Sequence, residues 1–98
     1  MPNKKTDYDV IRREERTEDE HRYLYELLMR RGENVACWRM PLYSIRVNMT
    51  DEYGNEGTAD AQDVFSDEEK ALGFFEKLVR NLATPIDLPY VLEDEMLG

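Results

Sequence analysis

The sequence predicts an α+β fold: a small antiparallel sheet of three to four strands, a meander, packed on one long C-terminal helix and followed by a second short helix. Residues 43–49 alternate strictly between apolar and polar side chains, the pattern of a strand with one buried face. Residues 66–83 instead carry apolar side chains at helical spacing. The loop-forming run at 51–55 leads into a second alternating segment at 58–65, so we expect these two strands to form a hairpin.

The long helix is predicted to begin at a capping box formed by Ser66 and Glu69. Its apolar residues fall within an arc of roughly 160°, which is wide enough to cover a core. They are Ala71, Leu72, Phe74, Phe75, Leu78, Val79 and Leu82. Because Thr84 precedes Pro85 and is pushed toward extended geometry, the helix is expected to stop by about Ala83.

A second, shorter helix is predicted after this step. Asp87 can cap it, with Pro89 tolerated in its first turn. Ile86 and Val91 can then pack together as a hydrophobic staple. The far end carries the acidic residues 93–95, whose charge is unfavourable at a helix C-terminus, so we expect fraying there.

The N-terminal half gives weaker patterns. Residues 1–7 have no periodicity and are expected to be a disordered N-terminus, which leaves 8–98 as a single α+β domain. Residues 8–16 alternate weakly before charged side chains dominate. Long charged side chains are typical of protected sheet edges, so this segment is interpreted as an edge strand.

Residues 22–30 fit two templates. Apolar residues recur at helical spacing, yet Tyr23, Tyr25, Leu27 and Met29 also alternate with polar residues as in a strand. In the strand interpretation, Leu24 and Leu28 stand on the polar face of the strand. Both faces would then carry apolar groups, which is relevant to function.

Composition excludes several kinds of site. The 98-residue chain has one cysteine, Cys37, and one histidine, His21, so it can form neither an internal disulfide nor a Cys/His zinc site. No nucleophile, base and orienting group can be assembled, and we predict no catalytic, cofactor-binding or metal-binding residues and no enzyme activity. No apolar run approaches the length of a membrane span and no signal-peptide pattern is present, so we expect a cytoplasmic protein.

Charge is distributed unevenly along the chain, whose net charge is −9. Residues 1–49 hold ten Lys and Arg against nine Asp and Glu, whereas residues 50–98 hold three against thirteen. The acidic balance disfavours nucleic acid and anionic membranes as partners, although a basic partner could bind the C-terminal half.

The order of these segments resembles a known family. The alternating strand, the hairpin return at 58–65, the capped helix, the Thr84-Pro85 step and the sequence Val91-Leu92-Glu93-Asp94 are similar to a small uncharacterised Firmicutes family, DUF6514-like. The similarity covers about residues 22–97. It implies a strand at 22–30 and brings no activity with it.

A sheet with helices on one face leaves its other face polar or in contact with a partner. We expect this open face to hold an apolar patch rimmed by arginines, which is the composition of an interface. The predicted interaction residues are Leu24, Leu28, Trp38, Arg22, Arg30 and Arg46. The leading hypothesis is therefore a protein-interaction module, with an unknown protein partner or as a homodimer through this face.

An RNA-binding module is the alternative. Arginines of the N-terminal half are interleaved with Tyr23, Tyr25, Trp38 and Tyr43, and such a composition can hold single-stranded RNA by stacking and phosphate contacts. Interspersed acidic residues weaken this interpretation because they cancel the positive field.

Overall fold

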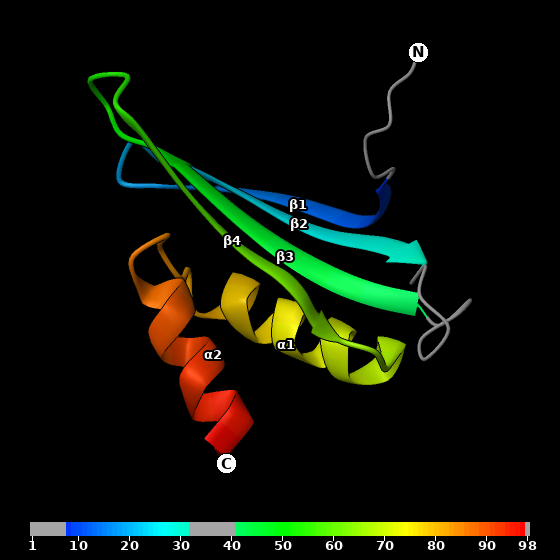
Figure 1. Ribbon diagram of the computed structural model, residues 1–98. Helices are drawn as coiled ribbons and strands as arrows, with labels where there is room; N and C mark the ends of the chain where they lie inside the picture. The colour runs from blue at the N-terminus through cyan, green and yellow to red at the C-terminus, as the bar shows by residue number, and fades with distance from the viewer. Residues whose placement is uncertain (1–7, 32–40, 98) are drawn as a thin grey trace.

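The computed structural model describes residues 8–31 and 41–97 and shows an α+β fold (Figure 1). The elements are β1 (Asp9–Glu18), β2 (His21–Arg31), β3 (Pro41–Thr50), β4 (Glu56–Phe65), α1 (Glu68–Arg80) and α2 (Asp87–Leu97). All three strand pairings are antiparallel and the strand order is β1-β2-β3-β4, so the predicted meander is confirmed with four strands. The N-terminal segment 1–7 and residues Cys37 and Trp38 lie outside the described residues.

Both helices lie on the same side of the sheet (Figure 1). Helix α1 contacts β2, β3 and β4, and α2 contacts β4. Strand β1 therefore forms one edge of the sheet beyond the main helix contacts. No described helix is long and apolar enough to cross a membrane.

The core lies between the sheet and the helices. Its fully buried side chains are Tyr25, Leu27, Ile45, Val47, Phe74, Phe75, Leu78 and Leu88. The Tyr25 hydroxyl donates to the carbonyl oxygen of Ala83 at 2.8 Å, which joins the sheet to the segment that links the two helices. This polar group is therefore buried with its hydrogen bond made.

Strand β2 decides between the two interpretations of residues 22–30. Tyr23, Tyr25, Leu27 and Met29 belong to the core or pack against it, so they share the face that the helices cover. The alternate residues, among them Leu24 and Leu28, lie on the opposite face. The strand interpretation is confirmed, and so is the interpretation of residues 8–16 as an edge strand.

The prediction of one long helix and one short helix is wrong. Helix α1 has 13 residues and α2 has 11. The reason is a Schellman motif at the end of α1, in which Ala83 N–H donates to the Leu78 carbonyl at 3.0 Å and Leu82 N–H donates to the Val79 carbonyl at 3.2 Å. Leu82 adopts φ 51°, so the chain leaves the helix although its apolar spacing continues.

Both predicted helix caps are also wrong. Asp67 rather than Ser66 caps α1, because its carboxylate accepts from the Glu69 amide at 3.2 Å. Ahead of α2 the capping residue is Thr84 rather than Asp87. The Asp87 amide donates to the Thr84 hydroxyl and the Thr84 amide donates to the Asp87 carboxylate, a reciprocal capping box. Pro85 thus directly follows the capping residue, where its missing N–H leaves no helical hydrogen bond unmade.

Candidate functional site

The open face of the sheet gathers the predicted interaction residues. Register pairs Leu24 with Asn48, Glu26 with Arg46 and Leu28 with Ser44, so these side chains share the face opposite the helices. Alternation along β2 and β3 places the remaining described members of the predicted set on the same face. They are Arg22 and Arg30. Trp38 lies outside the described residues.

A row of alternating charges crosses this face. Arg13, Glu26, Arg46 and Asp60 are register partners on β1, β2, β3 and β4 in turn. The nitrogen to oxygen distances along the row are 2.7 Å, 3.7 Å and 2.9 Å. The central carboxylate, that of Glu26, is buried between two guanidinium groups. We call this row the charge ladder; each of its arginines faces a carboxylate.

A second polar cluster lies beside the ladder at a β-bulge in β4. Asp63 adopts φ 53° where the register of β3 and β4 shifts. Its backbone N–H donates to the Ser44 hydroxyl at 2.9 Å, and its carboxylate accepts from Arg30 Nε at 3.1 Å. The hydrogen bond from Arg30 to Asp63 raises the pKa of that guanidinium, as the bond to Asp60 does for Arg46. Both guanidinium groups therefore form ion pairs with carboxylates of the same chain.

Apolar side chains also lie on the open face. Leu28 is buried and Leu24 is half-buried, while Val10, directly opposite Leu28 on β1, is 47% exposed. Sequence reasoning missed Val10 because its face depends on a register shift between Val10 and Arg12, which only the pairing with β2 defines. We call Val10, Leu24 and Leu28 the apolar strip.

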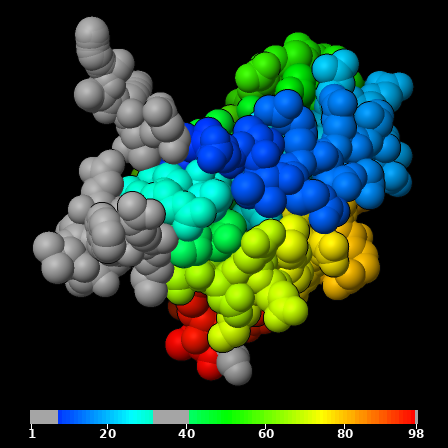
Figure 2. All heavy atoms as spheres, turned by 90° about the vertical axis from the view of Figure 1, so that its right-hand side faces the viewer, coloured from blue at the N-terminus to red at the C-terminus, as the bar shows by residue number. Residues whose placement is uncertain are grey.

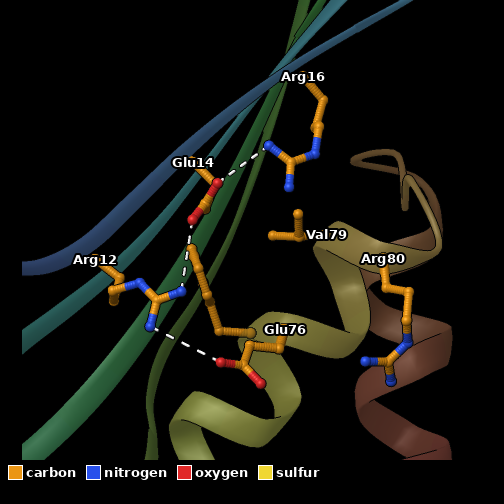
Figure 3. A pocket seen from close by; sticks show the side chains of 7 residues that line it. Arg12, Glu14, Arg16, Glu76, Val79 and Arg80 are labelled. Atoms are coloured by element: carbon orange, nitrogen blue, oxygen red, sulfur yellow. Dashed lines mark hydrogen bonds and ion pairs between the residues drawn. The ribbon is translucent and has the colours of Figure 1, made fainter.

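A groove runs between β1 and α1 on the helix side of the sheet. In Figure 2 the blue atoms of β1 adjoin the yellow atoms of α1. The cavity volume is about 290 Å³. Its lining residues, most of them labelled in Figure 3, are Arg12, Glu14, Arg16, Phe75, Glu76, Val79 and Arg80.

Ion pairs link the charged residues that line the groove, both within β1 and between β1 and α1. The Glu14 carboxylate lies 3.5 Å from a guanidinium nitrogen of Arg12 and 3.1 Å from one of Arg16 (Figure 3). Arg12 also reaches Glu76 of α1 at 3.8 Å and lies 5.6 Å from the centre of the Phe75 ring, a cation–π contact. These contacts fasten the edge strand to the helix, so most of the charged groups in this groove already have partners.

Within residues 8–31 and 41–97, no three His, Cys, Asp or Glu side chains converge on a position that could hold a metal ion. The candidate site is the open sheet face, on which the predicted residues gather. The groove between β1 and α1 is a separate concave feature on the helix side.

Comparison with known proteins gives one match. No curated protein and no solved structure matches the chain. The profile described as "Family of unknown function (DUF6514)" matches residues 6–97 and so covers nearly the whole sequence, strands and helices alike. The chain belongs to the DUF6514 family.

Proposed function

We propose that this chain is a non-enzymatic protein-interaction module that forms a homodimer through its open sheet face. The observation that carries the proposal is the one-sided fold, because α1 and α2 cover one face while the apolar strip and the charge ladder occupy the other. Within the strip Val10 is exposed and Leu24 is half-buried. Accessible apolar side chains with charged neighbours are the composition of an interface core and its rim.

A second copy of the chain suits this face. The ladder alternates positive and negative groups. When a two-fold axis brings the ladders of two copies together in opposite directions, each positive group can face a negative group of the other copy. Two sheets packed face to face lie about 10 Å apart, so side chains of the size of Val10 and Leu24 can interdigitate between them.

RNA binding remains the second candidate, and two observations weigh against it. Tyr25 and Tyr43 are buried in the core on the helix side, away from Arg30 and Arg46. Arg13, Arg30 and Arg46 of the open face pair with carboxylates, which reduces the positive charge available to phosphate groups. A protein partner fits a neutralised, partly apolar face better than a polyanion does.

The test compares self-association of matched variants. Leu24→Arg places a charge in the centre of the proposed interface, and Gly73→Arg places the same charge on an exposed position of α1 with open space around it. Sedimentation equilibrium is expected to give twice the chain mass for the wild type and for Gly73→Arg. Leu24→Arg is expected to sediment as a monomer with an unchanged circular dichroism spectrum.

A single-chain mass for the wild type at high concentration would refute self-association. Loss of the dimer in both variants would instead show that added charge acts non-specifically. Fluorescence anisotropy with labelled oligouridine at low salt addresses the alternative. No binding is expected, and salt-sensitive binding that Arg46→Gln weakens would favour the RNA interpretation.

A further inference from the structure

We propose that the outer face of α2 is a docking surface for a basic amphipathic helix of a partner protein. Four large apolar side chains within α2 or directly before it are exposed: Ile86 (76%), Tyr90 (69%), Met96 (52%) and Leu97 (81%). Ile86, Tyr90 and Leu97 share one side by helical spacing, and we call these three the α2 stripe. It lies on the helix side of the molecule, so it is separate from the open sheet face and can be tested independently of the homodimer.

Helix α2 is apolar on two opposite sides. Leu88, Val91 and Leu92 belong to the core or pack against it. At 3.6 residues per turn, Ile86, directly before α2, falls with Tyr90 and Leu97 on the other side, whereas Met96 falls nearer to Leu92. Because only one of its two apolar sides is covered by the core, α2 leaves apolar surface exposed, and such a surface is suited to a partner.

Charge around the stripe indicates what kind of partner fits. The acidic residues of α2 are Asp87, Glu93, Asp94 and Glu95, and the helix has no Lys, Arg or His. Lys77 of α1 pairs with Glu95 at 3.4 Å, whereas Glu93 and Asp94 make no ion pair with any described residue. Glu93 falls within the stripe by helical spacing, so a partner that covers the stripe must also neutralise its carboxylate.

Self-association through α2 is disfavoured, because it would place the carboxylates of two copies in the same interface, where they would repel each other. An anionic membrane surface is disfavoured for the same reason. A helix with lysines or arginines beside an apolar stripe satisfies both features at once. It would use the helix-in-groove mode of recognition, with apolar anchors spaced along one face.

The position of α2 leaves room for such a helix. In Figure 1, α2 lies at the side of α1, and it contacts β4 at the edge of the sheet. A partner helix against the stripe would pack on the side of α2 that faces away from the core, at the interaxial distance of about 8 to 10 Å that packed helices adopt. The 11 residues of α2 offer about three turns for contact.

The probe is a labelled synthetic peptide of about 18 residues, long enough to be helical, made of leucine and lysine with the leucines at amphipathic spacing. Fluorescence anisotropy with the full chain is expected to show binding that weakens as salt increases. Tyr90→Ser with Leu97→Ser should weaken binding about tenfold or more, and Glu93→Gln with Asp94→Asn should weaken it and reduce its salt dependence.

The controls separate this surface from general acidity and from apolar exposure elsewhere. Tyr53→Ser removes an equally exposed aromatic residue from the turn between β3 and β4, and it should leave binding unchanged. A peptide of the same composition without amphipathic spacing should bind at least tenfold more weakly than the amphipathic peptide. Equal binding of the two peptides, or equal loss with Tyr53→Ser, would overturn the proposal, as would a dimer that the Tyr90 and Leu97 variant abolishes.

Discussion

Tyr25 is fully buried although its side chain carries a hydroxyl group. Its ring belongs to the core and its hydroxyl donates to Ala83, and burial raises its pKa far above the ordinary value. The folded state therefore favours the neutral form of the Tyr25 hydroxyl. Because the folded pKa is raised, its contribution to stability is complete below about pH 10 and is lost as pH rises further.

Tyr25→Phe tests this account. The variant leaves the Ala83 carbonyl without its donor, so the free energy of unfolding is expected to fall by about 1 to 2 kcal/mol at neutral pH. Urea denaturation at about pH 8 and pH 11 should show a smaller alkaline loss of stability in the variant than in the wild type. Equal alkaline losses in the two proteins would contradict the assignment.

Asp51 shapes the turn between β3 and β4. Its carboxylate accepts from the backbone amides of Tyr53 and Asn55, each at 2.9 Å, and from the Asn55 side chain. The hydrogen bonds from Asn55, above all the backbone one, lower the pKa of Asp51. A lowered folded pKa means that the contribution to stability is present above the ordinary value near 4 and is lost as pH falls below it.

Asp51→Asn is therefore expected to destabilise the protein at neutral pH, since an amide oxygen is a weaker acceptor than a carboxylate. Its thermal midpoint should also fall less than that of the wild type between about pH 5 and pH 2. Glu52→Gln, in the same turn, is the matched control and should keep the wild-type pH dependence.

At the scale of the elements, the two-residue turn between β1 and β2 is strained. Asp19 and Glu20 have φ angles of 51° and 66°, the paired positive values of a type I′ turn. Glycine is favoured at the second central position and glutamate is not. Glu20→Gly should therefore raise the free energy of unfolding by about 0.5 kcal/mol or more.

The denaturation midpoint in urea measures this effect. Glu18→Gly, at the end of β1, is the control and should lower the midpoint, because glycine weakens a strand. A lower midpoint for Glu20→Gly as well would show that the turn is not of the type described.

The same elements show how far sequence reasoning reaches. Strand β3 was predictable because the side chains of Tyr43, Ile45 and Val47 belong to the core, whereas those of the residues between them lie on the opposite face. Strand β2 was ambiguous because Leu24 and Leu28 place apolar groups on its second face as well. Periodicity assigns a segment only where one face alone is apolar.

The ends of the helices were harder to predict from the sequence, because they depend on local backbone conformation and capping. The end of α1 depends on Leu82 in the left-handed region, where glycine would have been the usual signal. The start of α2 depends on a hydrogen-bonded pair, Thr84 with Asp87, that spans the Pro85 step. Of the open face, the sequence predicted Leu24 and the arginines. Val10 and the partners of those arginines required the register of the sheet.

At the scale of the whole molecule, the two proposed interaction surfaces differ in their charge. The open face is neutralised by its own ion pairs, whereas α2 is acidic with an apolar outer side. Two surfaces of different chemistry on opposite sides of the sheet suit a small protein that pairs with itself and with a second partner. The DUF6514 family match over residues 6–97 includes the strands and helices that carry both surfaces.

The most direct test of the central proposal is an isotope-filtered NMR experiment on a mixture of labelled and unlabelled protein. The homodimer predicts nuclear Overhauser contacts between protomers that involve the methyl groups of Val10 and Leu24 on the open face. Intermolecular contacts that involve only Tyr90 and Leu97 would place self-association on α2 instead. The absence of any intermolecular contact at concentrations where the chain is folded would contradict the homodimer.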